Sequence, residues 1–137
     1  WRGEKAARGV EKWRTTAREA AKQARRARVP EVAALATTAD VVGLLRSAAL
    51  GLVLHEVAAE PLTEVVAGTA GQRGEVVLVV GPEGGISDDE LAAFAAAGAR
   101  AVRLGPTVMR TSTAGVAAAA VVLARSGRWQ HAPEGTA

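Results

Sequence analysis

Two glycine-containing segments each follow directly after a short run typical of a β-strand. Residues 81–85 (GPEGG) follow residues 75–80 (EVVLVV), and residues 104–114 (LGPTVMRTSTA) follow residues 100–103 (RAVR). Glycine at a strand end lets the backbone come close to a ligand, because no Cβ stands in the way. In open α/β sheets, ligands bind at the carboxyl ends of the strands. The two segments therefore predict one site built from adjacent loops.

The rest of the chain alternates helix-like and strand-like patterns. We expect helices over residues 10–27, 40–48, 62–67, 87–97 and 113–125, and strands over residues 32–36, 50–55, 75–80 and 100–104. The continuous β-branched run at 75–80 predicts a strand buried on both faces. The alternation predicts the α/β class, with a mainly parallel sheet flanked by helices in a single domain spanning residues 1–137.

Local signals set several of these boundaries. Pro30 predicts the end of the first helix, since the residue before a proline is pushed out of the α region. Pro61 fits the first turn of a short helix. Ser87 and Glu90 have the spacing of a capping box, and Gly98 is typical of the end of the helix that this box opens.

The composition excludes several classes of protein. The 137 residues are 49% apolar, which indicates a globular domain, and no run is long enough to cross a bilayer. With no cysteine and only two histidines, a disulfide framework is excluded and a zinc site is disfavoured. No secretory signal is visible, so we expect a cytoplasmic protein without a metal or a membrane partner. The chain begins with Trp1 rather than Met, and we expect a further domain upstream.

Charge is spread unevenly along the chain. Residues 1–28 hold ten Lys/Arg and three Asp/Glu, a net charge of +7, although the whole chain carries only +3. Within the first helix a basic stripe lies beside an apolar one that includes Trp13, which we expect in the core. The basic stripe is either an ordinary solvated face or an RNA-binding surface, and the charge asymmetry favours RNA. The predicted RNA-binding residues are Arg14, Arg18, Lys22 and Arg25.

The glycine motif at 81–85 is neither GxGxxG nor a Walker loop, because no GK[ST] follows. A plain dinucleotide or nucleoside triphosphate site is therefore disfavoured. Alone, the motif is compatible with a simple tight turn between strand and helix. Arg110 lies in the second segment among small polar residues, just before a helix. Next to another glycine loop, such an arginine is typical of an anion or carbonyl binder.

Taken together, residues 81–91 (GPEGGISDDEL) and 104–114 resemble the SPOUT superfamily of RNA methyltransferases. Within it, the chain is similar to the small-subunit ribosomal RNA methyltransferase E family, which methylates uridine at N3. Residues 12–13 (KW), 18–21 (REAA) and 29–31 (VPE) occur in that family's order. The resemblance covers residues 5–125.

The resemblance implies S-adenosylmethionine as cofactor and small-subunit ribosomal RNA as substrate. It also implies a C-terminal trefoil knot, against the general rule that chains do not thread loops. Family members form homodimers and carry an N-terminal β-barrel RNA-binding domain, which this sequence does not contain. The final helix is apolar nearly all round, so we expect it in or near the dimer interface.

Carried onto this sequence, the motifs imply a cofactor slot with one wall at the end of the strand 50–55. The implied cofactor-binding residues are Leu54, His55, Gly81, Pro82, Glu83, Gly84, Leu104, Gly105, Val108, Met109, Thr113 and Ala114. Arg110 is the implied catalytic residue, stabilising the negative charge that spreads onto the uracil carbonyl oxygens when N3 loses its proton. Glu83, Glu56 and His55 are each weak candidates for the base, and its identity stays open.

Two other functions compete with uridine-N3 methylation. One is another SPOUT activity, such as methylation of a ribose 2′-oxygen. The other is a non-catalytic RNA-binding module that has kept the fold. The second would be favoured by Ser112, which stands where the family usually has Glu.

Overall fold

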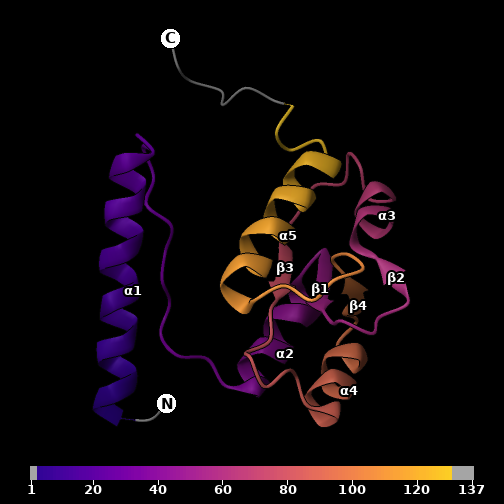
Figure 1. The fold of residues 1–137 in the computed structure, drawn as a ribbon, viewed down its shortest axis with the longest axis horizontal. Helices are drawn as coiled ribbons and strands as arrows, with labels where there is room; N and C mark the ends of the chain where they lie inside the picture. Colours follow the sequence, from indigo (N-terminus) through magenta and orange to yellow (C-terminus); the bar gives the residue numbers. More distant parts are fainter. Residues whose placement is uncertain (1–2, 131–137) are drawn as a thin grey trace. The chain divides into compact units, whose positions relative to one another are not determined.

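The computed structural model describes residues 3–130 (Figure 1). The chain divides into two compact units, Trp1–Ala39 and Asp40–Ala137, each of which is described by itself. The first unit contains the helix α1 (Gly3–Gln23) and the segment that follows it. The second unit contains a four-stranded sheet and the helices packed on it.

The sheet of the second unit is entirely parallel, in line with the mainly parallel sheet that was predicted. Its strands lie in the order β2-β4-β1-β3, so β1 and β4 are central and β2 and β3 are edges. The pairs β1–β3, β1–β4 and β2–β4 are all parallel. The strands are β1 (Leu50–Leu54), β2 (Glu60–Pro61), β3 (Val76–Val79) and β4 (Arg100–Arg103).

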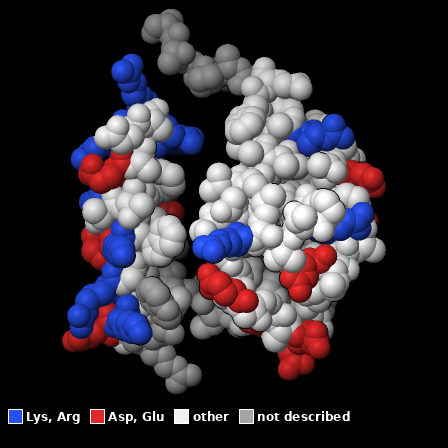
Figure 2. Space-filling view, viewed as in Figure 1, with Lys and Arg blue, Asp and Glu red and all other residues white. Residues whose placement is uncertain are grey.

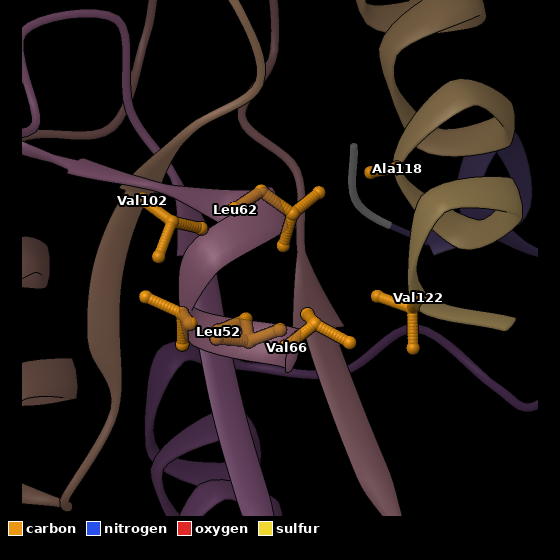
Figure 3. Close-up of a cluster of buried hydrophobic side chains, with 7 residues drawn as sticks. Leu52, Leu62, Val66, Val102, Ala118 and Val122 are labelled. Carbon is orange, nitrogen blue, oxygen red and sulfur yellow. The ribbon is translucent and has the colours of Figure 1, made fainter. Parts of the chain in front are cut away.

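Helices cover both faces of this sheet, which gives three layers. One buried cluster joins β1 and β4 to α3 and α5, and its centre is Leu52, Leu62, Val66, Val102, Ala118 and Val122 (Figure 3). A second cluster joins the sheet to α2 and α4 and contains Leu45, Val53, Phe94 and Ala97. Leu52 and its neighbour Val53 belong to different clusters because successive strand side chains point to opposite faces. The helices are α2 (Thr38–Ser47), α3 (Leu62–Ala67), α4 (Asp88–Ala96) and α5 (Thr111–Arg125).

The local helix signals of the second unit are confirmed. Pro61 is the N-cap of α3, in an extended conformation. Ser87 and Glu90 form both hydrogen bonds of a capping box at the start of α4. Gly98 follows α4 with φ +92, a left-handed conformation that glycine adopts without steric cost.

The predicted end of the first helix is wrong. The helix α1 ends at Gln23, well before Pro30, because Arg25 adopts a left-handed conformation with φ 51. The Arg26 amide then donates to the Ala21 carbonyl at 2.9 Å, and the Arg25 amide donates to the Lys22 carbonyl at 3.1 Å. This pair of bonds is a Schellman motif with arginine in the place usually taken by glycine.

The predicted strand at residues 32–36 does not form. In the described part of the chain these residues pair with no strand, and most of them are exposed. Their link to α1 is a side-chain bond, in which Arg14 Nε donates to the Val32 carbonyl at 3.1 Å. A short apolar run becomes a strand only when another strand lies beside it.

The strand predicted at 75–80 forms as β3, but it is not buried on both faces. All four residues of β3 are only partly buried. The reason is its place in the sheet, where among the described strands it pairs with β1 alone. The opposite edge strand, β2, was not predicted, because two residues carry no periodic pattern.

An ion pair between side chains links the edge strand β2 to β4. The Arg100 guanidinium, on β4, donates to both carboxylate oxygens of Glu60, on β2. This hydrogen bonding holds the pKa of Glu60 below its ordinary value.

No helix among the described residues is long and apolar enough to cross a membrane.

The layered core makes one stability prediction. Leu62 is 0% exposed and lies between the sheet and α5, so Leu62→Ala should lower the free energy of unfolding by about 3 kcal/mol. Urea denaturation followed by circular dichroism measures this. Leu44→Ala is the matched control, because Leu44 is 49% exposed and should cost only about 0.5 kcal/mol. Equal losses in the two variants would contradict the assigned core.

Candidate functional site

A cavity of about 560 Å³ lies where the carboxyl ends of three parallel strands meet. Its walls are the residues that follow β1, the glycine loop after β3, and the loop between β4 and α5. This is the edge of a parallel sheet at which ligands bind. The volume falls in the range of sites for small molecules and cofactors. Both glycine segments line this one cavity, as expected of adjacent loops, and its use as a binding site stays a prediction.

Eleven of the twelve residues predicted to hold a cofactor line this cavity. They are Leu54, His55, Gly81, Pro82, Glu83, Gly84, Leu104, Gly105, Val108, Met109 and Ala114. The exception is Thr113, which is exposed and lies outside the lining, whereas Ala114 beside it on α5 is buried. Arg110 also lines the cavity.

The three glycines of the 81–85 loop have different structural roles. A Cβ at Gly81 would lie 2.9 Å from Cγ1 of Ile86, so this glycine permits a close approach within the loop. Gly85 has φ +80, and its amide donates to the Pro82 carbonyl at 2.9 Å, closing a tight turn. A Cβ at Gly84 would meet nothing within 4 Å. Gly84 therefore leaves free space on the cavity side, as Gly105 does in the second loop.

Arg110 stands at the end of the second loop, where the helix α5 begins. The helix starts at Thr111, two residues earlier than predicted, and Arg110 is its N-cap in an extended conformation. Its carbonyl accepts hydrogen bonds from the amides of Thr113 and Ala114, at 2.9 and 2.8 Å. Its side chain makes no capping bond, and within residues 3–130 it forms no ion pair. The cation is exposed at the cavity and not engaged in holding the fold.

The sequence did not single out two residues that support the site. Arg103 lines the cavity, and its Nη1 donates to the carbonyls of Ala58 and Ala59, which holds the segment after β1 in place. Thr111 also lines the cavity, and its Oγ1 donates to the Gly81 carbonyl at 2.9 Å. The partners of these bonds lie 30 to 45 residues away in the chain. No local spacing could reveal them.

The candidate bases His55, Glu56 and Glu83 all line the cavity. The His55 amide donates to the Val102 carbonyl at 3.0 Å, which continues the β1–β4 pairing past the last residue of β1. Over the described residues, no three His, Cys, Asp or Glu side chains cluster in a way that could hold a metal ion.

The basic stripe belongs to the other unit and is partly neutralised. Glu11 lies 3.8 Å from Arg14 and 3.4 Å from Arg18, and Glu19 lies 3.0 Å from Lys22. Figure 2 shows blue and red side chains interleaved along this helix, at the left of the view. All these side chains stay exposed, and exposed pairs exchange easily for other partners.

Two predictions about this helix need correction. Arg25 is not on the helix with the other three basic residues but beyond its end. Trp13 was expected in the core, yet it is 65% exposed. The buried residues of α1 are Ala6 and Ala21, and of these only Ala21 belongs to the apolar stripe, so most of the stripe is not a core face within its own unit.

Comparison with known proteins places this geometry in context. The family model described as an RNA methyltransferase domain matches residues 1–123. The chain is 47% identical over 133 residues to the ribosomal RNA small subunit methyltransferase E of Mycobacterium bovis and to that of Mycobacterium tuberculosis. Each alignment covers 94% of this chain and 50% of the relative, so the chain spans about half the length of the curated relatives it matches.

Two solved structures share the fold. A methyltransferase from Legionella pneumophila, described as putative and solved with bound S-adenosylmethionine, has a TM-score of 0.76 and 30% identity, covering 88% of this chain and 48% of its own. A ribosomal RNA small subunit methyltransferase E from Neisseria gonorrhoeae, bound to S-adenosyl methionine, has a TM-score of 0.73 and 29% identity, covering 88% of this chain and 49% of its own. With the match of the family model across residues 1–123, this chain belongs to the RNA methyltransferase domain family.

Proposed function

We propose that the protein carrying this chain transfers a methyl group from S-adenosylmethionine to small-subunit ribosomal RNA, at N3 of a uridine. The observation that carries the proposal is the cavity at the three strand ends, lined by residues of both glycine motifs. Relatives that share the fold are solved with S-adenosylmethionine, and relatives that share the sequence are named for the ribosomal RNA small subunit.

The residues present fit this cofactor. An adenosine needs an apolar slot with a few backbone polar groups, and the cavity offers Leu54, Leu104 and Met109 beside the open backbone of Gly84 and Gly105. S-adenosylmethionine would supply a methyl group already activated by its sulfonium. The work left to the protein is to hold the acceptor in line with that methyl group and to stabilise the acceptor's charge.

Arg110 suits the second task. When uridine N3 loses its proton, negative charge spreads to the carbonyl oxygens of the uracil ring. A guanidinium at the cavity with no ion-pair partner among residues 3–130 is free to donate hydrogen bonds to those oxygens. His55, Glu56 and Glu83 stand at the same cavity as candidates to accept the N3 proton, and the choice between them stays open.

RNA contact is assigned to the first unit and to the rest of the protein. Arg14, Arg18, Lys22 and Arg25 would hold phosphates, which positions RNA without reading its sequence. Glu11 and Glu19 pair with Arg14, Arg18 and Lys22 at the surface. RNA phosphates could replace these carboxylates at a small cost in free energy, because exposed ion pairs are weak. Specific recognition would then come from a domain outside this chain, as in the family that the motifs resemble. Action on ribosomal RNA would place the protein in the cytoplasm.

A homodimer and the C-terminal trefoil knot stay part of the proposal. The exposed face of α5 supports the dimer. Val116 lies on this face in an apolar stretch of the helix, and it is 73% exposed. A second subunit would cover such a face. The contact of α5 with the loop after β3, through Thr111 and Gly81, is compatible with a knot in which the last helix follows a threaded segment.

The methylated position tests the function directly. We expect the full-length protein, with labelled S-adenosylmethionine and unmodified small-subunit RNA, to produce 3-methyluridine, identified by nucleoside mass spectrometry. A ribose-methylated nucleoside would instead support the alternative SPOUT activity. Absence of any methylated product, with RNA binding retained, would support the non-catalytic module.

The cofactor site is tested at Gly84. A Cβ there would meet no protein atom within 4 Å, so Gly84→Val should fold normally and place methyl groups in the space of the ligand. Calorimetric titration with S-adenosylmethionine should show an affinity at least about 10-fold weaker. Gly43→Val is the matched control, because Gly43 is an exposed helical glycine with equally open space and lies outside the cavity. Unchanged affinity in folded Gly84→Val would contradict the assigned site.

The role of Arg110 is tested by truncating its side chain. Arg110→Ala should lower kcat by about 10²-fold, the scale for losing one donor that acts in the transition state. Folding should be unaffected, because only the backbone of Arg110 caps α5. Arg46→Ala controls for loss of one exposed cation on the same unit, since Arg46 lies on α2 outside the cavity. Normal turnover in Arg110→Ala would remove this residue from the mechanism.

A further inference from the structure

One hydrogen bond joins the two loops that form the cavity. Oγ1 of Thr111, the first residue of α5, donates to the carbonyl oxygen of Gly81, two residues beyond the end of β3, at 2.9 Å. The bond is partly buried and spans 30 positions of sequence. Within residues 3–130, no other hydrogen bond connects the loop of residues 81–86 with the loop of residues 104–111.

The residues around this bond are closely packed, so the bond can influence the position of both cavity loops. Gly81 is closely packed, since a Cβ there would lie 2.9 Å from Ile86. A Cβ at Gly115, one turn into α5, would lie 3.7 Å from the Val80 side chain, so the first turn of α5 contacts the residue that follows β3. Beyond this packed point, residues 82–85 and 106–110 are exposed on both sides of the cavity. The exposed parts of both loops therefore begin next to the same packed contact, the hydrogen bond between Thr111 and Gly81.

We propose that Thr111 is a positioning residue, whose hydroxyl sets the spacing and orientation of the two loops for the cofactor. This inference rests on the proposed function. The bond orients the peptide that leads from Gly81 into the 82–85 turn, which forms one wall of the cavity. It also anchors the residue next to Arg110, so the cation starts from a defined backbone position. Thr111 would thus act on ligand affinity through other residues.

The test compares two substitutions at this position. Thr111→Val keeps the shape of the side chain but removes the donor and leaves a partly buried carbonyl without its partner. We expect its affinity for S-adenosylmethionine, measured by calorimetric titration on the full-length protein, to fall about 10-fold or more. Thr111→Ser keeps the hydroxyl and should bind within about 3-fold of the unmodified protein.

Thr69→Val is the matched control for stability. The Thr69 hydroxyl donates to the Val66 carbonyl at 2.8 Å and is also partly buried, but Thr69 lies outside the cavity. This variant also loses a partly buried hydroxyl bond, although the Val66 carbonyl keeps the Thr69 amide as a donor at 3.0 Å, and it should keep full affinity. If Thr111→Val fails to fold, the comparison between Thr111→Ser and Thr111→Ala decides, with only the alanine protein expected to bind weakly.

Three outcomes would overturn the inference. Full affinity in folded Thr111→Val would show that the bond does not position the loops. Thr111→Ser keeps the hydroxyl, so affinity as weak in Thr111→Ser as in Thr111→Val would show that the hydroxyl does not set the geometry of the loops. Equal weakening in Thr69→Val would assign it to general stability. If the unmodified protein does not bind S-adenosylmethionine, the proposed function fails and this inference fails with it, whereas the first three results leave the proposed function standing.

Discussion

The position of β1 between β3 and β4 is the constraint on which the rest of the second unit depends. β1 pairs with β3 on one side and with β4 on the other, and both pairs are parallel. The carboxyl ends of all three strands therefore lie at the same end of the sheet. Two neighbouring residues of β1, Leu52 and Val53, are almost fully buried and supply one side chain to each of the two cores. A single strand thus fixes both helix layers and brings the three loops of the cavity together.

Close packing at Gly51 shows how little freedom β1 has. A Cβ at this residue would lie 2.9 Å from the Leu45 side chain on α2 and 3.4 Å from the backbone of Ala99. The helix and the segment before β4 therefore approach the strand more closely than a side chain would permit. Because dense interiors do not deform continuously, the loops beyond the strand ends inherit a well-defined starting geometry.

Patterns with a local cause could be predicted from the sequence, and patterns with a distant cause could not. The capping box at Ser87 and the proline at position 61 act within a few residues, and both appear as predicted. The strand expected at 32–36 has the right residues but no neighbour, and the burial of β3 depends on its place at the edge. In the same way, the motifs indicated most of the cavity lining, whereas Thr111 and Arg103 reach it through partners that only the fold brings near.

Two glycines of one motif look equivalent in the sequence but are constrained by different parts of their surroundings. At Gly81 the obstacle to a side chain belongs to the protein, since Ile86 occupies the space. A smaller residue at position 86 would relieve that clash, so the two positions can change together in the course of evolution. A Cβ at Gly84 would meet no protein atom within 4 Å, so under the proposed function the constraint at this position comes from the ligand and not from the packing of the chain. Among homologous sequences, position 81 should therefore covary with position 86, while under the proposed function position 84 should vary only when the ligand itself changes.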